Sequence, residues 1–281
     1  MNLALSWRKN WPDLRAALFK GWPAFVWERA PEHLVDGVPV FCYHVADSER
    51  LNVDLKFLSQ NGYSTLTAQA FLDVLSGQAE ISDRSVVLTV DDGAHNLYDT
   101  IYPALKRHGL HAIAFVAPAF HRDRYDLPNE QRPCTWDELR EMQQSGHLDV
   151  QAHTWSHRYI PNWPEPLDLA GIDPGYSRAI QHAEPLALEA DLAKAKHVLE
   201  DELDTVIEHL AFPMYEGTAE AVSLAQSCGY SSCWWGTKPG RRGNLPSAAP
   251  TEIVRLSAEF IRRLPGEGRA SLKSIFQQRF R

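Results

Sequence analysis

The chain is short of cysteine and of long apolar runs, and these shortages exclude several classes of protein. Its 281 residues include four cysteines with no Cys-x-x-Cys spacing, which excludes a disulfide scaffold and favours a reducing compartment. No stretch approaches the roughly 18 apolar residues that a membrane-spanning helix needs. Residues 1–20 interrupt their apolar positions with charges and lack the apolar region of a signal peptide. We therefore expect a cytoplasmic protein.

Positive charge is also scarce, since the formal net charge is −8, and this excludes nonspecific nucleic-acid binding by the whole chain. The positive charge that is present gathers at the two ends. It predicts a basic, aromatic helical extension over residues 1–33 and a basic helix over residues 263–281. Such helices can lie on an anionic membrane, pack on the central domain or form an oligomer contact. The sequence leaves these roles and the oligomeric state open.

The central residues 34–262 lack a repeat and a glycine-rich dinucleotide loop, but they contain regularly spaced apolar runs. Seven runs are typical of buried strands: 38–43, 85–90, 111–117, 148–152, 208–212, 230–235 and 252–257. Four intervening stretches are helix-like: 53–62, 98–109, 135–146 and 189–203. Strands that alternate with helices indicate a parallel sheet with crossover helices. We predict an α/β fold that closes into a barrel of about seven strands.

Polar residues follow four of these strands, at the end where barrel enzymes carry their reactive groups. They are His44, the pair Asp91 and Asp92, His153, and the segment that begins at Pro213. A single Asp-Asp-Gly is usually a turn, and a single His-x-x-x-His pair is more often a surface or core feature than a ligand pair. Four such strand ends together indicate a site.

The residue types suit a metal. His153 and His157 are four apart, so on one helical turn they can face the same ion, and a carboxylate can supply a third ligand. Three protein ligands leave a position for water or substrate, as in catalytic zinc sites. Asp91 and Asp92 can divide two tasks, because neighbouring side chains on an extended backbone project differently. One carboxylate binds the metal and the other stays available as a base.

Around these aspartates and histidines the chain resembles the polysaccharide deacetylases of carbohydrate esterase family 4, the NodB-homology domain. Thr89-Val90-Asp91-Asp92-Gly93 resembles the first family motif, and His153-Thr154-Trp155-Ser156-His157 resembles the second. The stretch 211–217, Ala-Phe-Pro-Met-Tyr-Glu-Gly, is similar to the third motif. The opening 41–67 is similar to bacterial exopolysaccharide deacetylases. The resemblance covers roughly residues 37–257 and implies a distorted (β/α) barrel.

The resemblance also implies roles for individual residues. Asp92, His153 and His157 would hold one divalent metal, with Zn²⁺ favoured over Co²⁺, Ni²⁺ or Fe²⁺. Asp91 would be the general base acting on the metal-bound water. A backbone N–H near Met214 or Tyr215, in the segment that begins at Pro213, would help to stabilise the oxyanion.

The chain departs from the family pattern in ways that leave two roles open. An arginine that steadies the catalytic aspartate is missing near Ala211, and no clear Leu-x-His near the C-terminus supplies a general acid. Asp149 and Arg255 lie on predicted strands near the motifs and can orient groups of the site, but the sequence does not decide whether they do. His44, after Tyr43, is the candidate general acid, and the alternative is an ordinary histidine at a strand end.

Aromatic residues offer candidate sugar contacts. Trp234 and Trp235 can stack on a sugar face, although strand alternation places one of them in the core.

The motifs and their resemblance together predict a metal-dependent hydrolase of carbohydrate metabolism. It removes an N-acetyl group from an N-acetylated sugar, a cytoplasmic precursor or unit of a surface polysaccharide. The alternatives are a deformylase or other amide hydrolase on the same fold, and a catalytically inactive carbohydrate-binding protein.

Overall fold

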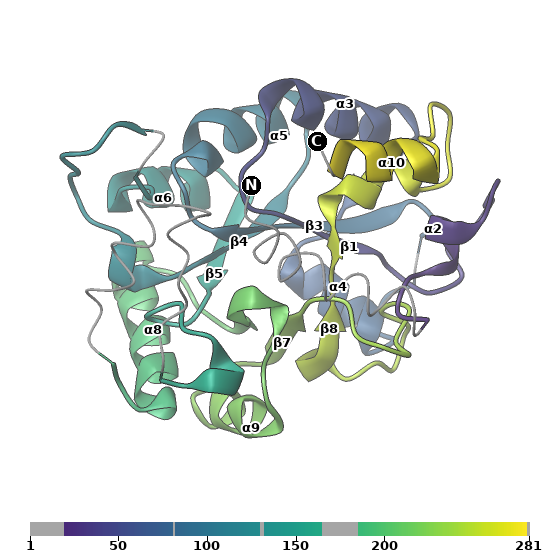
Figure 1. Ribbon diagram of the computed structural model, residues 1–281. Coiled ribbons are helices and arrows are strands. Elements are labelled where there is room, and N and C mark those ends of the chain that lie inside the picture. Colours follow the sequence, from purple (N-terminus) through teal and green to yellow (C-terminus); the bar gives the residue numbers. More distant parts are fainter. Residues whose placement is uncertain (1–19, 81, 130–131, 165–184, 280–281) are drawn as a thin grey trace.

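The protein is described by a computed structural model that covers residues 20–80, 82–129, 132–164 and 185–279 (Figure 1). Most of the predicted N-terminal extension, residues 1–19, lies outside the described residues. Within the described ranges, no helix has both the length and the apolar character needed to cross a membrane.

The sheet confirms all seven predicted strands. They are β1 (Val40–Tyr43), β3 (Ser85–Asp92), β4 (Ala112–Val116), β5 (Leu148–Ala152), β6 (His209–Ala211), β7 (Ser232–Trp235) and the split strand β8 (Ile253–Val254) and β9 (Leu256–Ser257). The order is β8-β7-β6-β5-β4-β3-β1-β9, and every pairing along it is parallel. The short strand β2 (Ser64–Thr65), which the sequence analysis missed, pairs with β3.

The sheet closes on itself at residues 253–257. Ile253–Val254 pairs with β7 at one end of the sheet, and Leu256–Ser257 pairs with β1 at the other. Arg255 lies between the two halves, so the same short segment joins both edges of the sheet. This arrangement confirms the predicted barrel and brings all the strand ends to a common rim.

Helices surround the sheet (Figure 1). They are α2 (Ala24–Trp27), α3 (Ser48–Gln60), α4 (Ala68–Leu75), α5 (Tyr102–His108, which continues a π-helical turn at Leu97–Ile101), α6 (Trp136–Gln144), α8 (Leu188–Leu203), α9 (Ala219–Ser227) and α10 (Leu272–Arg279). The four predicted helices correspond to α3, α5, α6 and α8. Side-chain caps begin several helices, and Thr135 with Glu138 forms a capping box on α6.

Two apolar clusters hold the barrel together. Alternate strand residues such as Leu88, Val90 and Val150 face outward and pack with the surrounding helices. The other face points inward, where Phe71 of α4 and Phe115 pack with the Trp234 indole. The packed apolar side chains in the barrel interior thus support the polar residues that line the rim.

The described parts of both chain ends pack against each other and on the barrel. The Trp22 ring contacts Phe260, which precedes α10, and Phe276, which lies on α10. The buried Arg263 guanidinium donates to the backbone carbonyls of Val26 and Glu28. The predicted C-terminal helix is present as α10, whereas the N-terminal segment contains only the four-residue α2 within the described residues. Membrane contact by these ends stays a prediction.

Candidate active site

Several non-glycine residues at the rim have a left-handed backbone conformation. Asp92, Thr154, His157, Met214 and Tyr215 have φ values of 75°, 62°, 52°, 53° and 67°. Such values are uncommon outside glycine and persist where the surrounding structure holds them. All five residues belong to the three segments that the sequence analysis singled out, so backbone strain is concentrated at the candidate site.

Asp92, His153 and His157 come together at the ends of β3 and β5. The Asp92 Oδ1 lies 3.0 Å from His157 Nε2 and 3.5 Å from His153 Nε2. Both histidine side chains are almost fully buried, whereas 24% of the Asp92 side chain is exposed. The three side chains therefore converge on one point that is open to solvent on the Asp92 side.

The geometry that brings the histidines together differs from the predicted helical turn. Residues 153–157 form a loop after β5, and the left-handed φ values of Thr154 and His157 are incompatible with a helix. The same correction applies to Asp92, which is left-handed where an extended backbone was predicted. The loop instead folds back so that the two rings lie 4.8 Å apart.

Buried hydrogen bonds hold this loop in place. Asp191 of α8 accepts from the Trp155 backbone N–H at 2.7 Å and from the Ser156 hydroxyl at 2.6 Å. The His157 N–H donates to the Thr154 hydroxyl. Asp191 is fully buried, and burial raises its pKa to about 6 despite these donors. The sequence analysis missed this residue because it lies on a helix with no motif.

The donor set fits a divalent cation. His153 pairs its Nδ1 with the Ala211 carbonyl at 2.8 Å, which fixes the ring and presents Nε2 toward Asp92. Burial lowers the pKa of His157 and so favours the neutral, metal-binding form, although Asp92 opposes this shift. Burial alone would raise the pKa of Asp92, but His44 and the two histidines hold it well below its usual range. The ionised carboxylate and the two imidazoles are ordinary zinc ligands.

Arg255 is the partner that the sequence analysis left open for Asp91. Its Nη1 and Nη2 donate to the two carboxylate oxygens at 2.6 and 2.9 Å, and both side chains are buried. Burial alone would raise the pKa of Asp91, but Arg255, followed by His153 and His44, holds it below its usual value. The arginine comes from the strand that closes the barrel. Asp149, also named from the sequence as a residue that can orient the site, accepts a hydrogen bond from the Gln151 amide.

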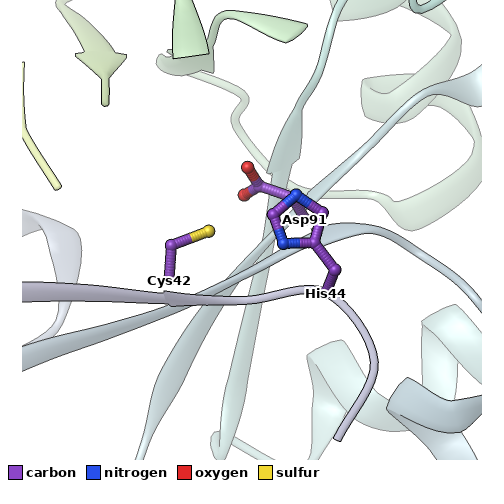
Figure 2. A group of neighbouring side chains, drawn as sticks. All are labelled: Cys42, His44 and Asp91. Carbon is purple, nitrogen blue, oxygen red and sulfur yellow. The ribbon is translucent and has the colours of Figure 1, made fainter. Parts of the chain in front are cut away.

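His44 follows β1, and its ring and the Cys42 sulfur both approach the Asp91 carboxylate (Figure 2). The Tyr215 hydroxyl is 3.4 Å from each ring nitrogen of His44 and 3.8 Å from the Cys42 sulfur. The Tyr215 ring also lies over the Arg255 guanidinium, with 5.4 Å between the ring centroid and Cζ. Tyr215 thus contacts both the candidate acid, His44, and the arginine that binds the candidate base.

The Pro213-Met214-Tyr215 segment forms a tight turn at the rim, after β6, with left-handed backbone at Met214 and Tyr215. The Tyr215 N–H donates to the Phe212 carbonyl at 3.1 Å, so this amide is already engaged. Of the two amides named from the sequence, this leaves the Met214 N–H as the predicted oxyanion donor.

The two tryptophans lie on opposite faces of β7. Trp234 is fully buried in the barrel interior, so its prediction as a sugar contact is wrong: no part of the ring reaches solvent. Trp235 faces outward, is 9% exposed, contacts Phe212 edge-on and donates to the Thr251 carbonyl. Strand alternation separates the two rings, and the interior packing fixes which one is enclosed.

Known proteins resemble this chain in sequence. The sequence model of the polysaccharide deacetylase family matches residues 78–233, which include both motif pairs. The chain is 24% identical over 201 residues to the putative polysaccharide deacetylase YxkH of Bacillus subtilis, covering 69% of this chain and 62% of that protein. It is 26% identical over 117 residues to the poly-β-1,6-N-acetyl-D-glucosamine N-deacetylase of Escherichia coli K12, covering 39% of this chain and 17% of that enzyme.

Solved structures share the fold. IcaB from Ammonifex degensii aligns with a TM-score of 0.64 at 23% identity, covering 87% of this chain and 96% of that one. The deacetylase domain of BpsB from Bordetella bronchiseptica aligns with a TM-score of 0.59 at 20% identity, covering 78% and 95%. The barrel matches the NodB-type deacetylase fold. The chain belongs to the polysaccharide deacetylase family.

Proposed function

We propose that this protein is a metal-dependent hydrolase that removes an N-acetyl group from an N-acetylated sugar. The observation that carries the proposal is the division of labour between two adjacent carboxylates. Asp92 faces two histidines, whereas Asp91 is paired with Arg255 and faces His44. The same site therefore holds a metal-ligand set and a separate ionised carboxylate.

Asp92, His153 and His157 would hold the cation. When bound, a divalent metal lowers the pKa of a water molecule and polarises a carbonyl group. Asp91 accepts a proton from the attacking water, which adds to the amide carbonyl carbon. Arg255 keeps Asp91 ionised and fixes the plane of its carboxylate. The Met214 N–H is the proposed donor to the oxygen that gains charge.

His44 is the proposed general acid. Cleavage of the C–N bond needs a proton on the leaving amine, and His44 lies beside Asp91 on the partly exposed side of the site. Tyr215 contacts its ring and limits its orientation. The products are acetate and a sugar with a free amine.

The proposed substrate class follows from relatives. One relative is named for N-deacetylation of poly-β-1,6-N-acetyl-D-glucosamine. This suggests an N-acetylhexosamine unit of a surface polysaccharide or its precursor. The chain spans 62% and 17% of the two curated relatives described above, so their whole-protein activities are not carried over. A cytoplasmic location stays a prediction from the sequence.

Two other functions use the same fold. A deformylase or other amide hydrolase would need the same carboxylates and histidines and would differ in the pocket around the acyl group. A catalytically inactive sugar-binding protein would not need an ionised, arginine-paired Asp91 beside the ligand set. The pairing of Asp91 with Arg255 therefore favours a catalyst.

The test is release of acid from matched substrates. The metal-loaded protein is incubated with N-acetylated and N-formylated β-1,6-linked glucosamine oligomers, and acetate, formate and free amine are measured. Release of acetate by the wild type and its loss in Asp91→Asn support the proposal. Release of formate alone supports a deformylase. Binding of oligomers without release of either acid supports the inactive protein.

A further inference from the structure

A second group of metal-binding atoms lies next to the Asp92 site. Cys42, His44 and Asp91 each offer one ligand atom, and these atoms lie within 4.8 Å of one another. In Figure 2 the Cys42 sulfur and the His44 ring both approach the Asp91 carboxylate, from the end of β1 and the turn after it. Thiolate, imidazole and carboxylate are the three ligand types of protein zinc sites.

We propose that Cys42, His44 and Asp91 form a second, inhibitory site for a thiophilic divalent cation such as Zn²⁺ or Cd²⁺. The proposal of inhibition rests on the proposed function, because the cation would occupy the candidate base and the candidate acid together. Binding of the cation at these three residues does not depend on what the enzyme hydrolyses.

The position of Cys42 makes the site selective for soft metals. Its side chain faces the barrel interior and is 4% exposed, and its S–H donates to the Tyr43 carbonyl. Burial raises the pKa of this thiol, so a cation must displace the proton to bind the sulfur. Metal binding therefore releases one proton from Cys42 to the solvent. Mg²⁺, which prefers oxygen ligands, gains little from such a site.

Arg255 explains why this site is weaker than the Asp92 site. Its guanidinium already binds both Asp91 oxygens, and its charge opposes a cation at that carboxylate. Each carboxylate oxygen has a second lone pair, so Asp91 can still bind a cation while it is paired with the arginine. Asp92, in contrast, faces the imidazoles of His153 and His157. We therefore expect the second site to fill only after the first.

A cation from solvent would enter the second site on the side of His44. Cys42 and Asp91 are buried, whereas His44 is partly exposed at the rim. A cation that reaches the site from solvent thus meets the imidazole first. Once bound, it prevents His44 from donating a proton and Asp91 from accepting one.

The test is a Cd²⁺ titration of metal-free protein, followed by ultraviolet absorption of the cadmium–thiolate bond and by ions bound per chain. The wild type is expected to bind two Cd²⁺ ions, with the thiolate band and proton release appearing with the second. Cys42→Ser and Cys42→Ala are expected to bind one ion without the band. His153→Ala, which disrupts the first site, is expected to keep the band. Cys228→Ser is the matched control, because Cys228 is the more exposed thiol, and it should behave as the wild type.

The proposal is overturned if the wild type shows no thiolate band at saturating Cd²⁺, or if the band persists in both Cys42 variants. Activity gives a separate readout: Zn²⁺ in excess of one equivalent should inhibit acetate release by the wild type and not by Cys42→Ser. If no substrate is hydrolysed, the proposed function fails, but the second Cd²⁺ ion and its band still test the site.

Discussion

Arg255 binds both carboxylate oxygens of Asp91 across a chain separation of 164 residues, with N–O distances of 2.6 and 2.9 Å. The arginine belongs to the segment whose two halves close the barrel, so closure of the sheet and orientation of the candidate base depend on the same five residues. The pair is buried, and removing either partner leaves a charge without compensation.

Replacing Arg255 by methionine is therefore expected to lower the free energy of unfolding by about 3 to 5 kcal/mol. Urea denaturation measures this change. Asp91→Asn with Arg255→Met is expected to recover part of the loss, because the double variant contains no unpaired charge. Equal stability of the single and double variants would mean that the two residues are not coupled.

Asp191 is expected to act on metal affinity without touching the metal. Its two hydrogen bonds hold the backbone between His153 and His157. Asp191→Ala should weaken metal binding by about 10- to 100-fold, as other outer partners of metal ligands do. Asp191→Asn, which keeps one acceptor, should recover part of the affinity.

The control for this prediction is Asp201→Ala, since Asp201 is an exposed residue of the same helix. Competition with a chelator measures the affinities of the three variants. An unchanged affinity in folded Asp191→Ala would show that the loop keeps its shape without the carboxylate.

His44→Gln is expected to lower kcat by about 10²- to 10⁴-fold, the usual contribution of a general acid. Retention of the first metal ion, measured at one equivalent, should not change, because His44 lies outside the Asp92 ligand set. The exposed His33 serves as the control position. A substrate with a better leaving amine should restore much of the rate, and a loss that is the same for every leaving group would remove His44 from that role.

Trp234→Phe tests the corrected role of the buried indole. The ring packs with Phe71 and Phe115 in the barrel interior. The substitution should lower the free energy of unfolding by about 1 to 3 kcal/mol through lost packing. KM for the sugar should stay as in the wild type, and a raised KM with unchanged stability would favour a sugar contact after all.

Asp54, which lies outside the candidate active site, is expected to make the free energy of unfolding depend on pH. Burial raises its pKa to about 7, although Arg50, Arg262 and the Tyr43 hydroxyl oppose this shift. An unfolded chain has a carboxyl pKa of about 3.9. Between roughly pH 4 and 7 the folded state thus holds a proton that the unfolded state lacks. The free energy of unfolding then falls as pH rises, by at most about 1.4 kcal/mol per pH unit.

Asp54→Asn removes this dependence, so the variant should gain stability relative to the wild type between pH 5 and pH 8. Thermal unfolding of both proteins at the two pH values measures the difference. A constant difference across this range would place the Asp54 pKa at its ordinary value.

The strands could be predicted from the sequence because each is a short apolar run. The convergence of Asp91, Asp92, His153 and His44 followed from their positions after those runs. The partner of Asp91 could not be chosen, because Arg255 lies in the last strand with no spacing that connects it to the motif. Only the closure of the sheet brings the two together.

The conformation of the loop between His153 and His157 also could not be predicted from the sequence. A spacing of four favours a helical turn, but Asp191 of α8 binds the backbone N–H and hydroxyl between the two histidines. These tertiary contacts support the left-handed values at Thr154 and His157. For Trp234 and Trp235, alternation separated the rings, and the register of the barrel decided which of them is enclosed.

The most direct measurement of the metal-dependent site is the metal content of purified protein after loading with one equivalent of Zn²⁺ and gel filtration. We expect about one ion per chain in the wild type and a large loss in His153→Ala. The exposed His33→Ala should match the wild type. A wild type that retains no Zn²⁺, Co²⁺ or Ni²⁺ under these conditions would contradict the assignment of Asp92, His153 and His157 as metal ligands.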